Sequence, residues 1–127
     1  MKENSNTETT STLISPLKSG DLGDFRVAFK MQLHKGFEAE YKKRHDKLWP
    51  DLEALLKSSG ISDYSIFIDG TTNALFGVMK ASSQKALDNL PAHPVMKKWW
   101  AYMKDLMECN EDNSPVAVPL TQLFYLQ

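Results

Sequence analysis

The stretch 25–34 reads FRVAFKMQLH and alternates between apolar and more polar side chains without a break. Its apolar side chains all project to one side of an extended backbone: Phe25, Val27, Phe29, Met31 and Leu33. Unbroken alternation of this length is typical of a β-strand with one buried face. The stretch therefore predicts a strand that packs one face on helices. Its second face, with Lys30, Gln32 and His34, is left for other contacts.

A proline divides the helical sequence that follows this strand. Gly36 opens a helical stretch, which must break or kink near Leu48–Pro50 because proline has no backbone N–H to donate inside a helix. Pro50 suits the first turn of the next helix, and Gly60 suits its end. The sequence therefore predicts one short helix before Pro50 and a second over 50–60.

Turn formers in DGTTN predict a β-hairpin. The stretches ISDYSIFID (61–69) and ALFGVMKA (74–81) are its expected strands. Gly77 leaves a gap in the second strand, where another group can approach the backbone closely. Three more elements complete the expected order: a short helix over 82–90, a longer amphipathic helix over 95–108 and a closing strand over 120–127.

The order strand, helix, strand, strand, helix, strand is the split βαβ pattern of a ferredoxin-like α+β sandwich. We expect an antiparallel sheet with helices on one face only. The other face must meet solvent, a ligand or a second subunit, and the exposed strand edges favour a homodimer. Residues 1–24 are rich in Ser, Thr, Asn and Gly and are expected to form a flexible N-terminal extension, whereas residues 25–127 form one domain.

The composition argues against several classes of partner. A formal net charge of -1 and a pI of about 6.3 give no bulk attraction to nucleic acid or to an anionic membrane. No apolar run approaches the roughly 18 residues that a membrane span needs. The single cysteine, Cys109, can form no disulfide within the chain and suits a reducing compartment. These features predict a cytoplasmic protein.

Tyr41 and His45 lie one turn apart in EYKKRHDK, so a helix presents them on the same face. An imidazole exchanges protons near neutral pH, and a phenol beside it can bind or orient a substrate hydroxyl. The charged run KKRHDK also fits a solvated surface helix, which is the more frequent context for a histidine. From the residues alone, catalysis at His45 and an ordinary surface histidine both stay open.

Three aromatic residues are candidates for the walls of a pocket. Trp99 and Trp100 are adjacent, so on a helix they diverge by about 100° and cannot both face one core. Trp99 suits the core, and Trp100 suits a pocket or an interface. An indole also suits the C–H face of a sugar ring. Tyr64, in the middle of a strand, is either a core residue or a pocket residue.

The other two histidines carry weaker expectations. His34 ends the first strand and could reach the same cavity, while His93, between two prolines, suits the start of a helix. Three histidines and one cysteine show no zinc spacing, and no glycine-rich phosphate loop is present. The sequence predicts neither a metal site nor a cofactor site.

Longer stretches of the chain resemble the L-rhamnose mutarotase family. They are EYKKRHDKLWPDLEALLKSSGISDYSIFID, WWAYMKDLMECNEDNSP and LFYLQ, and the resemblance covers residues 25–127. It implies a dimeric, ferredoxin-like α+β barrel protein without a cofactor, which interconverts the α and β pyranose anomers of L-rhamnose by acid/base catalysis with ring opening. It also implies residue roles, with His45 as the proton donor and a sugar site lined by Tyr41, Tyr64, Trp99 and Trp100.

Two other functions fit a dimeric ferredoxin-like fold. One is a small monooxygenase, and the other is a sugar-binding module without chemistry; a fold alone does not separate them from a mutarotase. The Tyr-x-x-x-His pair at Tyr41 and His45 favours the mutarotase.

Overall fold

The alternating stretch forms β1 (Phe25–Gln32), a central strand of a four-stranded antiparallel sheet. The computed structural model describes residues 24–127, and within them the strand order is β2-β3-β1-β4. The partners of β1 are β3 (Ala74–Ala81) on one side and the short β4 (Val118–Pro119) on the other. The edge strand β2 (Ile61–Asp69) pairs with β3 in the predicted hairpin.

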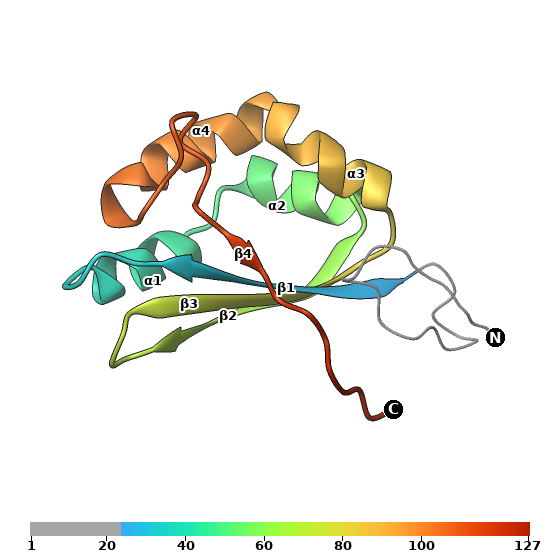
Figure 1. Ribbon diagram of the computed structural model, residues 1–127. Helices are drawn as coiled ribbons and strands as arrows, with labels where there is room; N and C mark the ends of the chain where they lie inside the picture. The colour runs from blue at the N-terminus through green and yellow to red at the C-terminus, as the bar shows by residue number, and fades with distance from the viewer. Residues whose placement is uncertain (1–23) are drawn as a thin grey trace.

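The helices cover one face of this sheet (Figure 1). We call that side the helical face and the opposite side the open face. The described helices are α1 (Glu38–Asp46), α2 (Pro50–Ser58), α3 (Gln84–Asn89) and α4 (Pro94–Met103), with 3₁₀ turns η2 (Leu90–Ala92) and η3 (Lys104–Leu106). The sequence therefore predicted the α+β class and the one-sided helical layer correctly.

The helix boundaries follow local chemistry. The break before Pro50 is confirmed, since α1 ends at Asp46 and Pro50 occupies the first turn of α2. The Ser83 hydroxyl accepts the N–H of Ala86 (3.1 Å) and caps α3, as Ser and Thr commonly do. His93 caps α4 by accepting the Val95 N–H at Nδ1 (3.2 Å), which confirms its place at a helix start.

Burial along β1 follows the predicted alternation. Val27, Met31 and Leu33 are buried toward the helical face, whereas Lys30 is exposed on the open face. The largest fully buried side chains are leucines that join the sheet to the helices: Leu33, Leu52, Leu75 and Leu106. The hydrophobic core therefore lies between the sheet and the helical layer.

Two predictions about the C-terminal third are wrong. The longer helix ends at Met103 and continues only as the 3₁₀ turn η3, so it does not span 95–108. The expected strand over 120–127 is also absent from the structure. Pro119 lacks the N–H that a longer ladder needs, and the chain leaves the sheet after the Leu120 N–H bonds to the Ala28 carbonyl (2.9 Å) (Figure 1).

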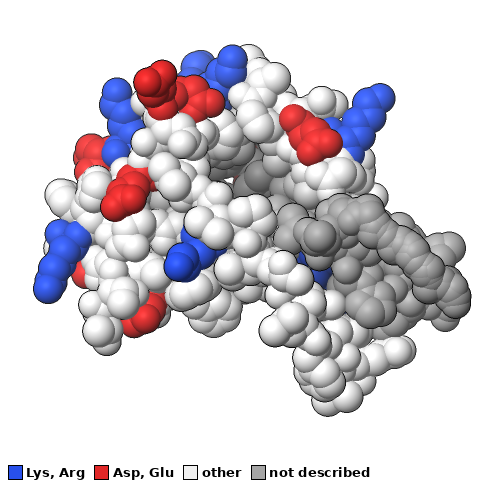
Figure 2. All heavy atoms as spheres, viewed as in Figure 1, with Lys and Arg blue, Asp and Glu red and all other residues white. Residues whose placement is uncertain are grey.

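The visible surface mixes charges of both signs. Figure 2 shows basic and acidic side chains interspersed, without a large patch of one sign on this side. Segment 120–127 carries no Lys, Arg, Asp or Glu. Within residues 24–127, every helix is too short or too polar to cross a lipid bilayer. The predicted extension over 1–24 lies, up to residue 23, outside the described residues.

Gly77 allows a close approach between two central strands. Gly77 of β3 faces Phe29 of β1 in the register, and a Cβ at Gly77 would lie 2.5 Å from Cζ of the Phe29 ring. Real Cβ atoms are essentially never this close to another carbon. The predicted gap in the strand is thus occupied by an aromatic ring, which lies flat against the backbone because glycine has no side chain.

Gly77→Ala is expected to destabilise the fold, because the added methyl overlaps the Phe29 ring. Overpacking of this kind lowers the free energy of unfolding by about 1–3 kcal/mol. Urea denaturation measures the effect, and Gly70→Ala is the matched control because a methyl there meets no atom within 4 Å. Stability equal to that of the Gly70→Ala variant would contradict this account. The double variant Gly77→Ala/Phe29→Leu should recover part of the loss.

Candidate active site

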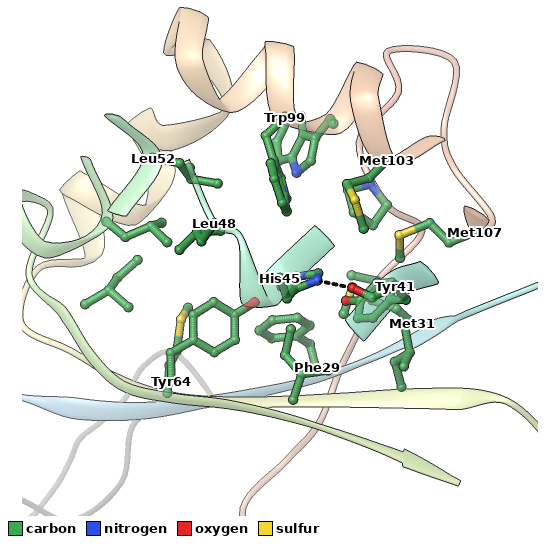
Figure 3. A pocket seen from close by; sticks show the side chains of 18 of the residues that line it. Phe29, Met31, Tyr41, His45, Leu48, Leu52, Tyr64, Trp99, Met103 and Met107 are labelled. Carbon is green, nitrogen blue, oxygen red and sulfur yellow. Dashed lines mark hydrogen bonds between the residues drawn. The ribbon is translucent and has the colours of Figure 1, made fainter. Parts of the chain in front are cut away.

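A cavity of about 1130 Å³ lies between the helical face of the sheet and helices α1, α2 and α4 (Figure 3). It is lined by every residue that the sequence placed in a site: Tyr41, His45, Tyr64, Trp99 and Trp100. These side chains come from α1, β2 and α4, which are distant in sequence. The fold therefore brings all of the candidate residues to one place.

The orientation of His45 is fixed by its own helix. Its Nδ1 lies 2.9 Å from the Tyr41 carbonyl oxygen, one turn earlier. A carbonyl oxygen can only accept, so Nδ1 carries the hydrogen and Nε2 of the neutral ring keeps its lone pair. The ring packs on the Tyr41 ring at a centroid distance of 4.3 Å and stands edge-on to Trp99 at 5.4 Å.

Burial makes His45 a weaker base than an ordinary histidine. Removal of water disfavours the imidazolium and lowers the pKa of His45. The Tyr41 carbonyl and the carboxylate of Asp46 oppose this effect without cancelling it. The resting side chain near neutral pH is therefore the neutral imidazole, with Nε2 able to accept a proton.

Two phenols share the cavity with this imidazole. Tyr41 is buried in the core, and desolvation, together with the nearby Tyr64, raises the pKa of Tyr41 well above its usual range. Desolvation also raises the pKa of Tyr64 to about 12. The exposure of Tyr64 is toward the cavity, into which its ring points beside Phe29 (Figure 3). Both hydroxyls thus stay protonated and can donate hydrogen bonds to a ligand.

A β-bulge places Tyr64. Ser62 pairs with Lys80 and Ser65 with Val78, so Asp63 and Tyr64 lie in an irregular step of the β2–β3 ladder. Asp63 takes a left-handed backbone with φ 49°, which Asp tolerates better than most residues. Bulges redirect side chains and are frequent near active sites. The irregular step therefore sets where the Tyr64 phenol enters the cavity.

The two tryptophans serve both core and cavity. Trp99 is 6% exposed and belongs to the main core cluster, as predicted, yet its ring also contacts His45 at nearly a right angle. Trp100 is only partly buried and lines the same cavity. The prediction that Trp100 suits a pocket agrees with this position. The prediction that the two cannot both face one core is wrong, because Trp100 packs against the same core cluster as Trp99 and both line the cavity.

Sequence reasoning missed several apolar walls. Phe29 was assigned only to a buried strand face, and methionines were not singled out at all, although five of them line the cavity: Met31, Met79, Met96, Met103 and Met107. Methionine fills irregular space and adapts to ligands. The chain has 6 methionines in 127 residues, and this content was the available signal.

Other candidate chemistry is not brought to the cavity. His34 is exposed and does not line it, and His93 caps α4. The charged residues along the lining are Glu38, Lys42, Glu53, Lys57 and Asp63. Among residues 24–127, no three His, Cys, Asp or Glu side chains are placed to hold a metal ion. The arrangement offers one imidazole for proton transfer and two phenols for hydrogen bonding.

Residues 26–126 match the sequence model of the L-rhamnose mutarotase family. Relatives named L-rhamnose mutarotase include a Leptothrix cholodnii protein, 55% identical over 101 residues, which are 80% of this chain and 95% of the relative. A Rhizobium etli protein of the same name is 58% identical over 99 residues, or 78% and 93% of the two chains.

Solved structures agree with these relatives. The crystal structure of an L-rhamnose mutarotase from Formosa agariphila has a TM-score of 0.75 and 51% identity, covering 80% of this chain and 98% of that chain. A Mycobacterium tuberculosis protein with 14% identity has a TM-score of 0.50 over 82% of this chain and 99% of that chain. The second likeness concerns the fold alone.

His45 is expected to be neutral near neutral pH, with its proton on Nδ1, and to titrate below the histidines of the unfolded chain. Proton–nitrogen NMR of the imidazole identifies the tautomer, and a pH titration gives the pKa, with the chain in concentrated urea as the reference. Because the pKa of this histidine is higher in the unfolded chain than in the fold, the unfolded chain takes up a proton at a higher pH. The histidine therefore lowers the stability of the fold as pH falls below about 6.5. A proton on Nε2 in the neutral form, or a pKa at or above the reference, would contradict the geometry.

Proposed function

The chain belongs to the L-rhamnose mutarotase family, and we propose that His45 catalyses its reaction, the interconversion of the α and β pyranose anomers of L-rhamnose. The protein is therefore an isomerase that acts on a carbohydrate. The observation that carries the assignment of His45 is its fixed ring, in which the Tyr41 carbonyl holds Nδ1 and leaves Nε2 for a substrate in an apolar cavity.

The reaction moves one proton from O1 to O5. Neutral His45 accepts the proton of the anomeric hydroxyl at Nε2 while the C1–O5 bond breaks and C1=O1 forms. The imidazolium then donates that proton to O5, so His45 is the proton donor to the ring oxygen. Rotation about C1–C2 and the reverse steps close the ring on the other face. Because O1 and O5 are bonded to the same carbon, one nitrogen can serve both oxygens.

The aromatic residues bind the sugar. Tyr41 and Tyr64 keep their protons because their pKa values are raised, so they donate hydrogen bonds to sugar oxygens. Trp99 and Trp100 offer flat apolar surfaces for the C–H groups of the ring. A 6-deoxy sugar is uncharged and carries a methyl group, which suits walls of aromatic rings and methionine thioethers.

His45→Ala is expected to lower kcat by roughly 10² to 10⁴, the usual contribution of a positioned acid–base group, with a much smaller change in KM. Exchange NMR between the α and β anomers of L-rhamnose measures both quantities at several sugar concentrations. His34→Ala is the matched histidine control, since His34 does not line the cavity. If His45→Ala equilibrates the anomers as fast as the parent, His45 is not the catalytic group.

We also propose that the subunit is ferredoxin-like and that two subunits pack their open faces together as a dimeric α+β barrel. The antiparallel order β2-β3-β1-β4 with a one-sided helical layer supports the first part. Exposed apolar side chains in the register row of Lys30, on the open face, support the second: Phe67 is 61% and Val118 48% exposed, although Phe67 also belongs to the cavity lining. The C-terminal segment 120–127 adds three exposed apolar side chains, Leu123, Phe124 and Leu126, which are 94%, 78% and 80% exposed. A second subunit would bury this surface.

Phe67→Glu is expected to convert a dimer into monomers, because a buried carboxylate without a partner opposes association. Sedimentation velocity at micromolar concentration measures the mass. Ala101→Glu adds the same charge at an exposed site on α4 and should remain dimeric. A parent protein that sediments as a monomer, or a Phe67→Glu variant that stays dimeric, would contradict pairing through the open face.

We place the enzyme in the cytoplasm, and its cysteine supports this location. Cys109 is unpaired, and its Sγ lies 3.4 Å from the Met107 carbonyl oxygen. Partial burial raises the pKa of Cys109, although nearby Lys104 opposes the shift. A free cysteine is typical of proteins from a reducing compartment, and the raised pKa makes this thiol a poor nucleophile.

A further inference from the structure

The helix that carries His45 has little apolar support of its own. α1 has nine residues, and Tyr41 is its buried side chain. A helix of this length is marginal without tertiary contacts. Rotation of α1 about its axis would carry Nε2 of His45 away from the cavity. Contacts other than apolar packing must therefore help to fix this helix.

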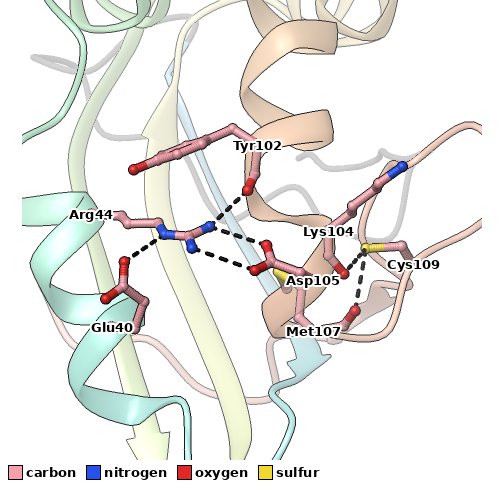
Figure 4. A network of polar contacts seen from close by, with 7 residues as sticks. All are labelled: Glu40, Arg44, Tyr102, Lys104, Asp105, Met107 and Cys109. Carbon is pink, nitrogen blue, oxygen red and sulfur yellow. Dashed lines mark hydrogen bonds and ion pairs between the residues drawn. The ribbon is translucent and has the colours of Figure 1, made fainter.

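Arg44 makes such contacts at the C-terminal end of α1 (Figure 4). Its Nε donates to Glu40 Oε2 (2.8 Å) on the same helix. Nη1 donates to the Tyr102 carbonyl oxygen (2.7 Å) on α4, and Nη1 and Nη2 donate to the two carboxylate oxygens of Asp105 (3.1 and 3.4 Å) on η3. The guanidinium therefore bridges α1 to the helix that forms another wall of the cavity.

The same guanidinium supports the aromatic wall that faces His45. Its Cζ lies 4.4 Å from the centroid of the Tyr102 ring. Tyr102 packs on Trp49 at 5.4 Å, and Trp49 meets Trp99 edge to face at 5.1 Å. Trp99 stands edge-on to His45. A continuous series of ring contacts therefore runs from Arg44 back to the imidazole.

Burial and geometry distinguish Arg44 from an ordinary surface ion pair. Lys42 and Asp46 of the same helix also form an i,i+4 pair, with side chains 77% and 60% exposed; Asp105 is as exposed as Asp46, at 60%, but the Arg44 side chain is only 14% exposed. Exposed pairs contribute little. A planar guanidinium can bind a carboxylate with two N–H groups and a carbonyl with the same fork, whereas a lysine ammonium is a single point charge.

We propose that Arg44 is a positioning residue for the mutarotase reaction. The hydrogen bonds of its guanidinium to Asp105 and to the Tyr102 carbonyl set the rotation of α1 and thereby direct Nε2 of His45 toward the sugar. The inference rests on the proposed role of His45. Arg44 does not line the cavity, so it acts through the position of the imidazole and not by contact with substrate.

Arg44→Lys keeps the positive charge but removes the planar guanidinium and its paired hydrogen bonds to Asp105. It is expected to lower kcat on the order of 10- to 100-fold, the effect of a misplaced catalytic group, while KM for L-rhamnose changes little. Asp105→Asn keeps one oxygen acceptor for Arg44, so it should also lower kcat, but by a smaller factor than Arg44→Lys. Lys43→Met, which removes an exposed charge from the neighbouring position, should keep the parent kcat. Exchange NMR between the anomers measures all three variants well below their unfolding temperatures.

The imidazole itself reports its position without reference to catalysis. In Arg44→Lys, the pKa of His45 should rise toward its ordinary value, because a rotated ring is better hydrated. The variant keeps the identity of every other ionisable group near the imidazole: Glu38, Tyr41, Lys42 and Asp46 on α1, Glu53 and Lys57 on α2, and Asp63 and Tyr64 on β2. A rise in the pKa of His45 together with a fall in kcat supports the proposal.

Two results would overturn it. One is a folded Arg44→Lys variant with the parent kcat. The other is a loss of kcat while the pKa and NMR shifts of His45 stay as in the parent, because the loss would then have another cause. Failure of the proposed function is a separate result, namely a His45→Ala variant with parent activity, and it leaves the NMR response of His45 to Arg44→Lys unaffected.

Discussion

The hydrogen bond between His45 Nδ1 and the Tyr41 carbonyl determines what this cavity can do. An imidazole free to turn could present either nitrogen, and each tautomer would place its lone pair differently. The backbone of α1 removes that choice, because the carbonyl acceptor is one turn away on the same helix. Tyr41 therefore contributes in two ways: its carbonyl sets the tautomer, and its hydroxyl remains protonated at the cavity wall.

The sheet provides the space in which this imidazole works. Phe29 lies flat on β3 because Gly77 has no side chain, so the ring covers the floor of the cavity without filling it. The core is divided into a larger cluster around Leu33, Leu52 and Trp99 and a smaller one around Val27 and Ile61. Packing on these clusters stabilises the fold, while methionines surround the open volume with adaptable side chains.

Sequence patterns predicted those helices and strands whose boundaries depend on neighbouring residues. The alternation of 25–34, the break at Pro50 and the hairpin after 61–69 depend on neighbouring residues, and the structure has all three. The prediction of a closing strand over 120–127 failed because a strand needs a partner strand, which an apolar sequence cannot supply by itself.

The residues that line the candidate site could be predicted from the sequence, but the contacts that hold those residues in position could not. The i,i+4 spacing of Tyr41 and His45 placed them together, and the structure keeps them in contact. Arg44 looked like one member of a charged run, because its partners Tyr102 and Asp105 lie 58 and 61 residues away in sequence. The bulge at Asp63 likewise arises from pairing between strands, so no local sequence pattern predicted it.

The distribution of charge around the cavity bears on the role proposed for His45. Both lysines of the lining are paired, Lys42 with Asp46 and Lys57 with Glu53, each at 2.8 Å, and the Glu38 carboxylate accepts a hydrogen bond from Asn73 (2.9 Å). Desolvation is then the main influence on the pKa of His45. An unpaired carboxylate beside Nε2 would hold the ring protonated and prevent it from accepting the O1 proton, whereas an unpaired ammonium would suppress the imidazolium that O5 needs. A neutral sugar requires no charge for its recognition, which is consistent with the proposal that the imidazole accepts and donates the same proton.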